Sequence, residues 1–300
     1  MTDKRTPLHP VWRRRPLARL VGGVAGVLAG FFFNTAAAQQ PGPGRIAFFY
    51  GETIDPKALA GYDQVVVEPD NGFVPKIADA KGLPPKHMRW IAYVSVGEVL
   101  PTRDYYPGMP KAWRIGRNGD WKSEVIDQAA PGWPQFFVDK VIAPLWANGY
   151  RGFFLDTLDS YELVAKTDAE RARQQAGLIA VIKRIHRRFP RAELILNRGF
   201  ELMPEVHDDV AAVAFESLYR GWDEGRRQYV TVPEDDRMWL LARAREVRER
   251  YGLPVISIDY CAPADTACAR QTVAQIRAQG LIPYVGDGHL MQVNPAAAQD

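Results

Sequence analysis

Histidine and cysteine are scarce in this 300-residue chain, and neither is spaced like metal ligands. Four of the five histidines follow residue 38, and none belongs to an HExxH or other paired-histidine motif. Zinc hydrolases usually carry such ligands at fixed spacing, so the sequence predicts neither a metal site nor a cofactor. A glycine-rich nucleotide-binding turn is also missing, since Tyr50, at the end of the first apolar run, is followed by Gly-Glu-Thr-Ile.

Beyond its first 38 residues the chain has no excess of positive charge. The formal net charge is +3, but residues 1–38 contain six cationic side chains and one acidic side chain. The remaining residues carry 32 Lys and Arg against 34 Asp and Glu. Nucleic-acid binding requires a basic surface that displaces counterions from phosphate, so no nucleic-acid partner is expected.

Long apolar runs are absent except near the N-terminus. Arg13, Arg14 and Arg15 precede an apolar stretch at 17–33, and three alanines at 36–38 supply a small-residue cleavage pattern. A retained anchor is the alternative, but the uncharged run is shorter than the ~20 residues of a spanning helix. We predict a signal peptide at 1–38, a short linker at 39–44, and an exported protein, periplasmic or secreted, with no stable membrane anchor after cleavage.

The two cysteines, Cys261 and Cys268, both follow the predicted signal peptide. In an oxidising compartment, an even pair close in sequence can form a local disulfide. Two unpaired structural thiols are the alternative, because closing so short a loop contributes little entropy. We expect the disulfide.

Eight short apolar runs recur along the rest of the chain, each of strand length. They are mostly continuous rather than alternating, which is typical of a parallel sheet covered on both faces. The runs are 46–50, 64–68, 90–96, 152–156, 193–197, 211–216, 255–259 and 281–285.

Helical patterns separate the later runs. A capping box at Thr167–Glu170 opens one helix, Thr231–Glu234 opens another that ends at Gly252, and two more are expected at about 134–148 and 266–279. The stretch 100–131 shows no regular pattern. Eight strands alternating with helices predict a single (β/α)8 TIM-like barrel over residues 45–300, and an open doubly wound sheet is the alternative.

Polar side chains stand at or just beyond the ends of these runs. In a barrel the carboxyl ends of the strands form one rim, where active sites are built. Each acid alone could cap a helix or pair with an arginine, but so many acids at the ends of apolar runs favour a functional cluster and carboxylate-pair catalysis. The residues are Tyr50, Glu68, Glu98, Asp156, Asn197, Glu216, Asp259 and, shortly after the last run, Asp287.

Five segments carry a more specific resemblance: residues 62–69, 92–98, 152–157, 214–218 and 282–284. Together they resemble the endo-α-1,4-polygalactosaminidase family of glycoside hydrolases, and in particular the hydrolase domain of Pel exopolysaccharide hydrolase/deacetylases. The resemblance implies a barrel that cleaves within α-1,4-linked galactosamine/N-acetylgalactosamine exopolysaccharide by a retaining two-carboxylate mechanism. Asp156, in Phe-Leu-Asp-Thr, matches the nucleophile, and Glu216, in Phe-Glu-Ser-Leu, matches the general acid/base.

The same resemblance implies a cationic or partly acetylated galactosamine-rich polysaccharide as partner. The Pel enzymes also carry a deacetylase region, for which this sequence has no room, so any deacetylation is expected to come from a separate protein. Acids of the rim would pair with amines and aromatic rings would stack on sugar faces, although about half of the aromatics are expected to be ordinary packing. A non-catalytic glycan-binding barrel and a hydrolase of a different α-linked glycan are the alternatives. The expected substrate contacts are Tyr50, Glu68, Tyr93, Glu98, Asp159, Tyr161, Asn197, Tyr219, Trp222, Asp259, Tyr284 and Asp287.

Overall fold

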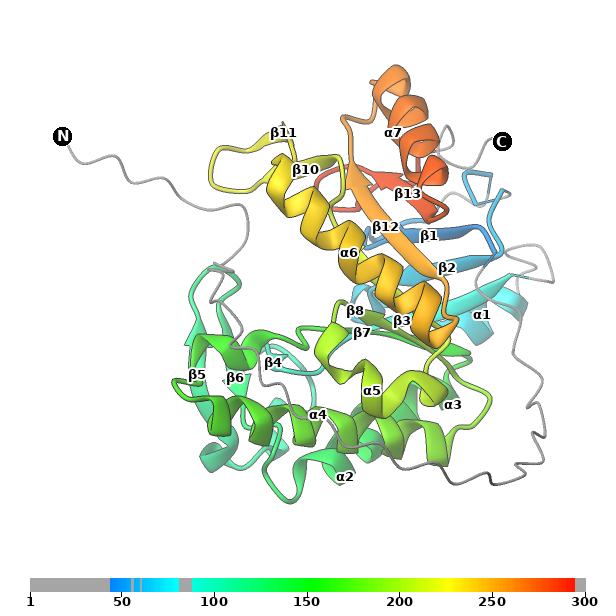
Figure 1. The fold of residues 1–300 in the computed structure, drawn as a ribbon. Coiled ribbons are helices and arrows are strands. Elements are labelled where there is room, and N and C mark those ends of the chain that lie inside the picture. The colour runs from blue at the N-terminus through cyan, green and yellow to red at the C-terminus, as the bar shows by residue number, and fades with distance from the viewer. Residues whose placement is uncertain (1–43, 55–56, 60, 81–87, 295–300) are drawn as a thin grey trace, which may run out of the picture.

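Eight parallel strands form the main sheet of the molecule. The structure is a computed structural model that describes residues 44–54, 57–59, 61–80 and 88–294. The sheet has the order β1-β2-β3-β7-β8-β9-β12-β13 and curves into a nearly closed barrel (Figure 1). The strands are β1 Ile46–Phe49, β2 Gln64–Val67, β3 Arg89–Ser95, β7 Gly152–Asp156, β8 Glu193–Asn197, β9 Ala212–Glu216, β12 Val255–Tyr260 and β13 Ile282–Gly286.

The first and last strands of this sheet meet where the barrel closes. The Tyr284 hydroxyl on β13 donates a hydrogen bond of 2.7 Å to the Phe48 carbonyl on β1. Just beyond β1, the Tyr50 amide donates to the Leu290 carbonyl, also at 2.7 Å. The predicted (β/α)8 barrel is thereby confirmed, and the open doubly wound sheet is excluded.

Apolar composition explains why these segments are strands. Each of the eight predicted runs matches an observed strand to within one residue at either end. All residues of β1 and β2 are buried, as continuous apolar runs require when a sheet is covered on both sides. Aromatic rings fill part of the interior, where Phe48 and Phe154 pack edge to face with centroids 5.1 Å apart.

The helices lie around the outside of the barrel (Figure 1). The capping box that opens α4 is confirmed, because Thr167 and Glu170 bond reciprocally to each other's backbone. The start of α6 was predicted wrongly: Thr231 ends a strand, and Pro233 is the N-cap, while Gly252 ends the helix with φ +67° as expected. The bounds are α1 Pro75–Ala80, α2 Trp133–Phe137, α3 Ala143–Ala147, α4 Asp168–Arg188, α5 Met203–Val206, α6 Glu234–Tyr251 and α7 Thr266–Ala278.

Shorter helical turns link these elements. A π-helix, η4 (Val138–Ile142), joins α2 to α3, so the single helix expected at 134–148 has three parts. The 3-10 helices are η1 Pro69–Asn71, η2 Tyr106–Gly108, η3 Lys111–Trp113, η5 Ser160–Leu163, η6 Phe200–Leu202 and η7 His207–Asp209.

Two small antiparallel sheets stand outside the barrel, to its left in Figure 1. One has three strands in the order β4-β6-β5, and the other pairs β10 with β11. In the first sheet, β5 and β6 lie in the stretch at 100–131 where no regular pattern was found, and β4 directly precedes that stretch. Their bounds are β4 Glu98–Val99, β5 Arg114–Asn118, β6 Ser123–Ile126, β10 Arg220–Asp223 and β11 Gln228–Thr231.

Cys261 and Cys268 form a disulfide with Cα atoms 6.1 Å apart. It ties the chain just after β12 to the first turn of α7. The predicted signal peptide at 1–38 and the linker up to residue 43 lie outside the described residues. None of the helices in the described ranges has the length and apolar character needed to cross a membrane.

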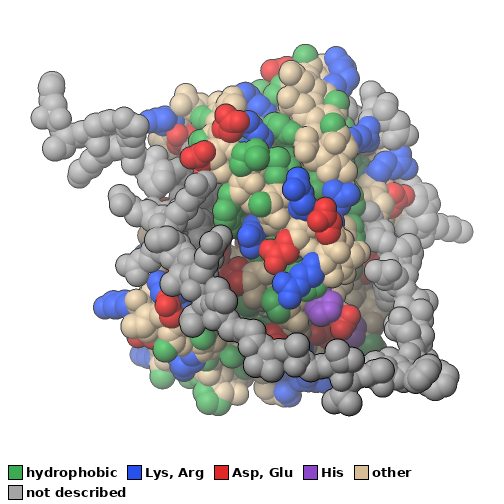
Figure 2. Space-filling model, viewed as in Figure 1, with side chains coloured by type: hydrophobic (Ala, Val, Ile, Leu, Met, Phe, Trp, Pro, Cys, Tyr) green, Lys and Arg blue, Asp and Glu red, His purple; other side chains and the backbone are tan. Residues whose placement is uncertain are grey.

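The outer face of α6 carries charges of both signs. Figure 2 shows Lys or Arg and Asp or Glu side chains interspersed over this helix. Glu246 accepts from Arg243 at 2.8 Å and lies 3.6 Å from Arg250. Such exposed helical pairs each contribute about 0.3–0.5 kcal/mol, so they add little to the stability of the fold.

Candidate active site

Asp156 and Glu216 end strands β7 and β9, and Asn197 ends β8 between them. All three side chains are half-buried at the carboxyl rim of the barrel. Asn197 Nδ2 donates to Asp156 Oδ1 at 2.8 Å and to Glu216 Oε1 at 3.3 Å. One amide group therefore bridges the two carboxyl groups that the sequence singled out.

This bridge limits the separation of the two carboxyl groups. Because a single nitrogen bonds to both, Asp156 Oδ1 and Glu216 Oε1 lie no more than about 6 Å apart. The carboxyl groups of retaining glycosidases are ~5–5.5 Å apart, whereas those of inverting enzymes are ~6.5–9.5 Å apart. The upper limit for this pair of oxygens is compatible with the shorter, retaining separation.

Three tyrosines surround the carboxyl pair. The Tyr93 hydroxyl donates to Asp156 Oδ2 at 2.7 Å, and the Tyr260 hydroxyl donates to Glu216 Oε2. Burial, followed by the nearby negative charge of Glu216 or Asp156, raises the pKa of Tyr50, Tyr93 and Tyr260 well above the usual value. The three hydroxyls are consequently protonated at neutral pH and can act as hydrogen-bond donors.

The backbone on either side of the pair is held by polar contacts. After Asp156, the chain turns at Thr157 with φ +60°, and the Thr157 hydroxyl accepts from the Gly97 amide at 2.9 Å. After Asn197, Arg198 has φ +59° and donates to the Glu216 carbonyl at 2.7 Å. Both turns use a left-handed conformation that non-glycine residues seldom adopt, so these contacts stabilise a strained rim.

Asp159 lies in the loop that follows Asp156. Burial, opposed by Arg198 and reinforced by Asp156 and Glu201, raises the pKa of Asp159 to about 6. In the described part of the chain, no other residue donates a hydrogen bond to its carboxylate. Asp159 is thus a rim acid with a nearby positive charge, Arg198, and with no hydrogen-bond donor to its carboxylate among the other described residues.

Other predicted contacts are found at the rim but are engaged with the protein. Glu68 caps η1 through the Asp70 amide and pairs with Arg103 at 2.9 Å. Asp287 accepts from the amides of its own loop at 289 and 292. Both acids therefore have structural duties in addition to any contact with a ligand.

Tyr219 and Trp222 are half-buried aromatic residues beyond Glu216. The Tyr219 ring has the Arg237 guanidinium over it at 5.7 Å. Trp222, on β10, packs against Tyr229 and His289 with ring centroids 4.8 and 5.4 Å away. Part of each ring stays accessible to solvent, as stacking on a sugar requires.

Four of the expected contact residues are instead buried inside the protein, which argues against direct contact with a substrate. Glu98 is 4% exposed and accepts from Asn118, Ser123 and Ser160. Tyr161 is 1% exposed and donates to Glu201 at 3.0 Å. Tyr284 and Asp259 are fully buried, the first at the barrel seam and the second beneath the segment after Glu216.

The reason is that a polar residue at a strand end can point into the protein as well as toward solvent. A buried polar group needs hydrogen-bond partners, and each of these four has them. Sequence position alone does not distinguish these two orientations. The expected substrate contacts therefore included four acids and tyrosines that are buried inside the protein.

Sequence reasoning also missed residues that contact the carboxyl pair. Tyr260 follows Asp259 at the end of β12 and bonds Glu216, but it was left out of the expected site. Arg198 follows Asn197 and holds the Glu216 backbone. The only sequence signal for either was a position one residue past a predicted apolar run, 255–259 or 193–197, and many residues share such a position.

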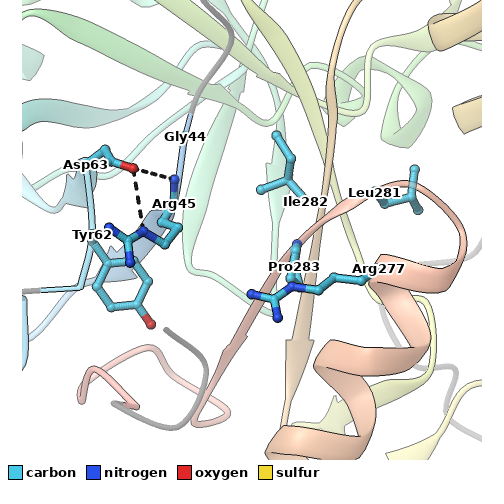
Figure 3. A pocket seen from close by; sticks show the side chains of 8 residues that line it. All are labelled: Gly44, Arg45, Tyr62, Asp63, Arg277, Leu281, Ile282 and Pro283. Carbon is cyan, nitrogen blue, oxygen red and sulfur yellow. Dashed lines mark hydrogen bonds and ion pairs between the residues drawn. The ribbon is translucent and has the colours of Figure 1, made fainter. Parts of the chain in front are cut away.

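A cavity at the opposite end of the barrel is a separate feature (Figure 3). It has a volume of about 400 Å³ and lies near the amino ends of β1, β2 and β13. Barrel enzymes place their chemistry at the carboxyl rim, so this cavity is not the candidate active site. Its lining comprises Gly44, Arg45, Tyr62, Asp63, Arg277, Leu281, Ile282 and Pro283.

Comparison with protein families identifies the class of enzyme. The model of glycoside hydrolase family GH114 matches residues 33–300. The chain belongs to family GH114. It is accordingly a glycoside hydrolase, with Asp156 and Glu216 at the rim where barrel hydrolases act.

Solved structures agree with the GH114 assignment. The glycoside hydrolase domain of PelA from Pseudomonas aeruginosa is 35% identical, with a TM-score of 0.75 over 84% of this chain and 98% of that domain. Aspergillus fumigatus Ega3, solved with galactosamine, is 16% identical, with a TM-score of 0.63 over 85% of this chain and 96% of that one, and shares the fold. An uncharacterised protein of Deinococcus radiodurans is 27% identical over 262 residues, covering 80% of this chain and 78% of its own length.

No group of three His, Cys, Asp or Glu side chains within the described ranges is arranged to hold a metal ion. What the rim does contain is two carboxyl groups joined by an amide and flanked by neutral hydroxyl donors. This arrangement can transfer a proton at one carboxyl group and support nucleophilic attack at the other.

Proposed function

We propose that this GH114 hydrolase cleaves within α-1,4-linked galactosamine/N-acetylgalactosamine exopolysaccharide by a retaining double displacement. The observation that supports the proposal is the Asn197 bridge, which keeps one oxygen of each carboxyl group within about 6 Å of the other, a limit compatible with a retaining pair. The resemblance of the motifs around Asp156 and Glu216 to those of polygalactosaminidases assigns the former as nucleophile and the latter as general acid/base.

The reaction follows in two balanced steps. Glu216 gives its proton to the glycosidic oxygen while an Asp156 oxygen attacks the anomeric carbon, which breaks the glycosidic bond and forms a glycosyl ester. Glu216, now ionised, takes a proton from water, and the resulting hydroxide attacks the same carbon and releases Asp156. Tyr93 and Asn197 hold Asp156 in one orientation, and Tyr260 and Asn197 hold Glu216.

A deacetylated galactosamine unit is cationic, and the rim offers it a carboxylate. Asp159 supports this role best, because no other described residue donates a hydrogen bond to its carboxylate, which lies near Asp156. Tyr219 and Trp222 are the proposed stacking surfaces. Tyr50, which is half-buried and lies near both carboxyl groups, is proposed as a donor to a sugar hydroxyl. Glu68 and Asp287 are secondary candidates, since each already binds the protein.

The cellular setting is proposed from the N-terminal sequence. Arg13 to Arg15, the apolar stretch and the alanine cleavage pattern support export to the periplasm or the exterior. We also propose that the substrate is deacetylated by a separate protein and that residues 45–300 act as one barrel domain.

Product analysis tests the proposed substrate. Residues 39–300 would be incubated with partially deacetylated galactosamine oligosaccharides and analysed by mass spectrometry beside Asp156→Asn and Glu216→Gln. The wild type should shorten the chains and both variants should leave them intact. Cleavage of neutral α-glucans or galactans instead would show a hydrolase of another glycan, and binding without cleavage would contradict the catalytic pair.

Stereochemistry tests the mechanism separately. The first anomer released would be followed by proton NMR before mutarotation. Retention predicts the α-anomer, and initial release of the β-anomer would overturn the double displacement while leaving the substrate assignment intact.

A further inference from the structure

Asp259 is a buried carboxylate that contacts no solvent yet accepts four hydrogen bonds. Oδ1 accepts from the Leu218 amide at 3.2 Å and the Ser257 hydroxyl at 2.7 Å. Oδ2 accepts from the amides of Tyr219 at 2.6 Å and Arg220 at 2.7 Å. Its exposed fraction is 0%.

The three amides belong to consecutive residues, and the segment they form begins two residues after Glu216. Successive backbone amides that converge on one anion fix the path of the chain, because each amide dipole must point at the same centre. Residues 218–220 connect the end of β9 to the start of β10. The Asp259 side chain thus determines the direction in which the backbone leaves Glu216.

Strand β12 holds Glu216 in a second way. Ile258 pairs with Glu216 in the parallel register of β12 and β9. The hydroxyl group of Tyr260, the residue after Asp259, donates a hydrogen bond to the Glu216 carboxyl group. Consecutive residues of β12 therefore bind the Glu216 side chain and the backbone that follows it.

An anion in this position is costly to bury. A neutral residue would avoid the desolvation of the charge, yet only an acceptor with two oxygens can serve all three amides and the Ser257 hydroxyl. Burial raises the pKa of the Asp259 carboxyl group, whereas its four hydrogen-bond donors favour the ionised form and tie it to the segment after Glu216.

We propose that Asp259 is a positioning residue for the proton transfers of Glu216. Its carboxylate holds residues 218–220 so that the Glu216 carboxyl group meets the glycosidic oxygen in the correct orientation. The inference rests on the proposed role of Glu216 as general acid/base. It replaces the expectation that Asp259 itself contacts substrate.

A substrate that needs no protonation separates positioning from a general structural role. Departure of fluoride from an α-galactosaminyl fluoride requires no acid, whereas departure of a sugar requires Glu216. We expect Asp259→Asn to lower kcat on galactosamine oligosaccharides about 100-fold, with a small change in KM. With the fluoride, the first step should remain within about fivefold of wild type, and azide, which needs no base, should rescue turnover.

Matched variants make the outcome decisive. Glu193→Gln removes a buried carboxyl group at the amino end of β8, far from the rim, and should lower stability without changing kcat on folded protein. Ser257→Ala removes one donor to Asp259 and keeps the three amides. It should fold, lose about three- to tenfold in kcat on oligosaccharides and lose nothing with the fluoride.

Equal losses on both substrates in Asp259→Asn and Ser257→Ala, or the absence of azide rescue, would overturn the positioning role. If Asp259→Asn does not fold, Ser257→Ala alone is compared with the wild type on the oligosaccharides and on the fluoride. A ratio of the two kcat values equal to that of the wild type would overturn the positioning role. Failure of Glu216→Gln to affect oligosaccharide cleavage would instead refute the proposed function, so the two failures are distinguishable.

Discussion

The Tyr93 hydroxyl donates a hydrogen bond of 2.7 Å to Asp156 Oδ2, across two neighbouring barrel strands. Asn197 Nδ2 donates a hydrogen bond to the other oxygen of the same carboxyl group, Asp156 Oδ1. With both oxygens bonded, Asp156 is held in one orientation. In the role proposed for Asp156, a carboxylate fixed in this way needs little reorganisation before it attacks an anomeric carbon.

Replacing Tyr93 with phenylalanine should lower kcat by about 10- to 100-fold, since hydrogen bonds to charged groups are worth about 1.5–3 kcal/mol. Steady-state kinetics on galactosamine oligosaccharides would measure the loss. Tyr150→Phe is the matched control, because the Tyr150 hydroxyl bonds the Phe73 carbonyl away from the rim. An equal loss in both variants would contradict a specific role for Tyr93.

Asn197 keeps two carboxyl groups close together without adding charge. Changing Asn197 to aspartate removes the shared donor and places a third carboxyl group between the first two, so kcat should fall at least about 100-fold at neutral pH. Asn197→Leu removes the donor alone and should lose less. The two variants would be compared across pH, and identical losses at every pH would argue that charge repulsion is unimportant.

Asp159 predicts a pH-dependent change in stability. Its pKa rises from 3.8 in the unfolded chain to about 6 in the folded protein, so between these values the folded state binds more protons. Stability is therefore lost as pH rises from about 4 to 6, and the penalty persists at pH 7. Asp159→Asn should stabilise the protein at pH 7 by at most about 3 kcal/mol and have no such effect below pH about 4.

Urea unfolding at the two pH values measures this difference. The charged groups that act on the Asp159 carboxyl group are Arg198, Asp156 and Glu201. The activity of Asp159→Asn would also be measured, to show whether the substitution disturbs them. A stabilisation that is equal at both pH values would show that the charge of Asp159 is not its cause.

Trp222 tests the proposed stacking surface. Trp222→Ala should raise KM for long oligosaccharides about five- to tenfold with a smaller change in kcat, because a lost aromatic contact costs about 1 kcal/mol. Trp239→Ala is the control, since Trp239 is 38% exposed and packs on Phe200 from helix α6. Equal changes in KM for the two variants would contradict a specific sugar contact at Trp222.

The barrel was predictable because burial on both sides requires continuous apolar strands. Runs such as 152–156 and 193–197 match β7 and β8 at both ends. The small sheet of β4, β5 and β6 was not predicted, because only part of its residues is buried and its pattern is weak. Strand β11 is likewise half-exposed, and its last residue, Thr231, was mistaken for the start of a helix.

The position of the carboxyl pair was also predictable, from acids at the ends of apolar strands. Which other rim residues face a ligand was not. Glu98 and Asp159 have similar sequence settings, yet Glu98 accepts three side-chain hydrogen bonds inside the protein and Asp159 accepts none from another described residue. The difference depends on donors far away in the chain, such as Asn118 and Ser123.

The end of β12 assigns a different task to each of three consecutive residues. Asp259 anchors a backbone segment, Tyr260 contacts the Glu216 carboxyl group, and Cys261 is covalently joined to helix α7. An insertion or deletion of one residue here would displace all three partners at once. Transplanting this active site onto another barrel would therefore require moving this tripeptide intact, together with its disulfide partner.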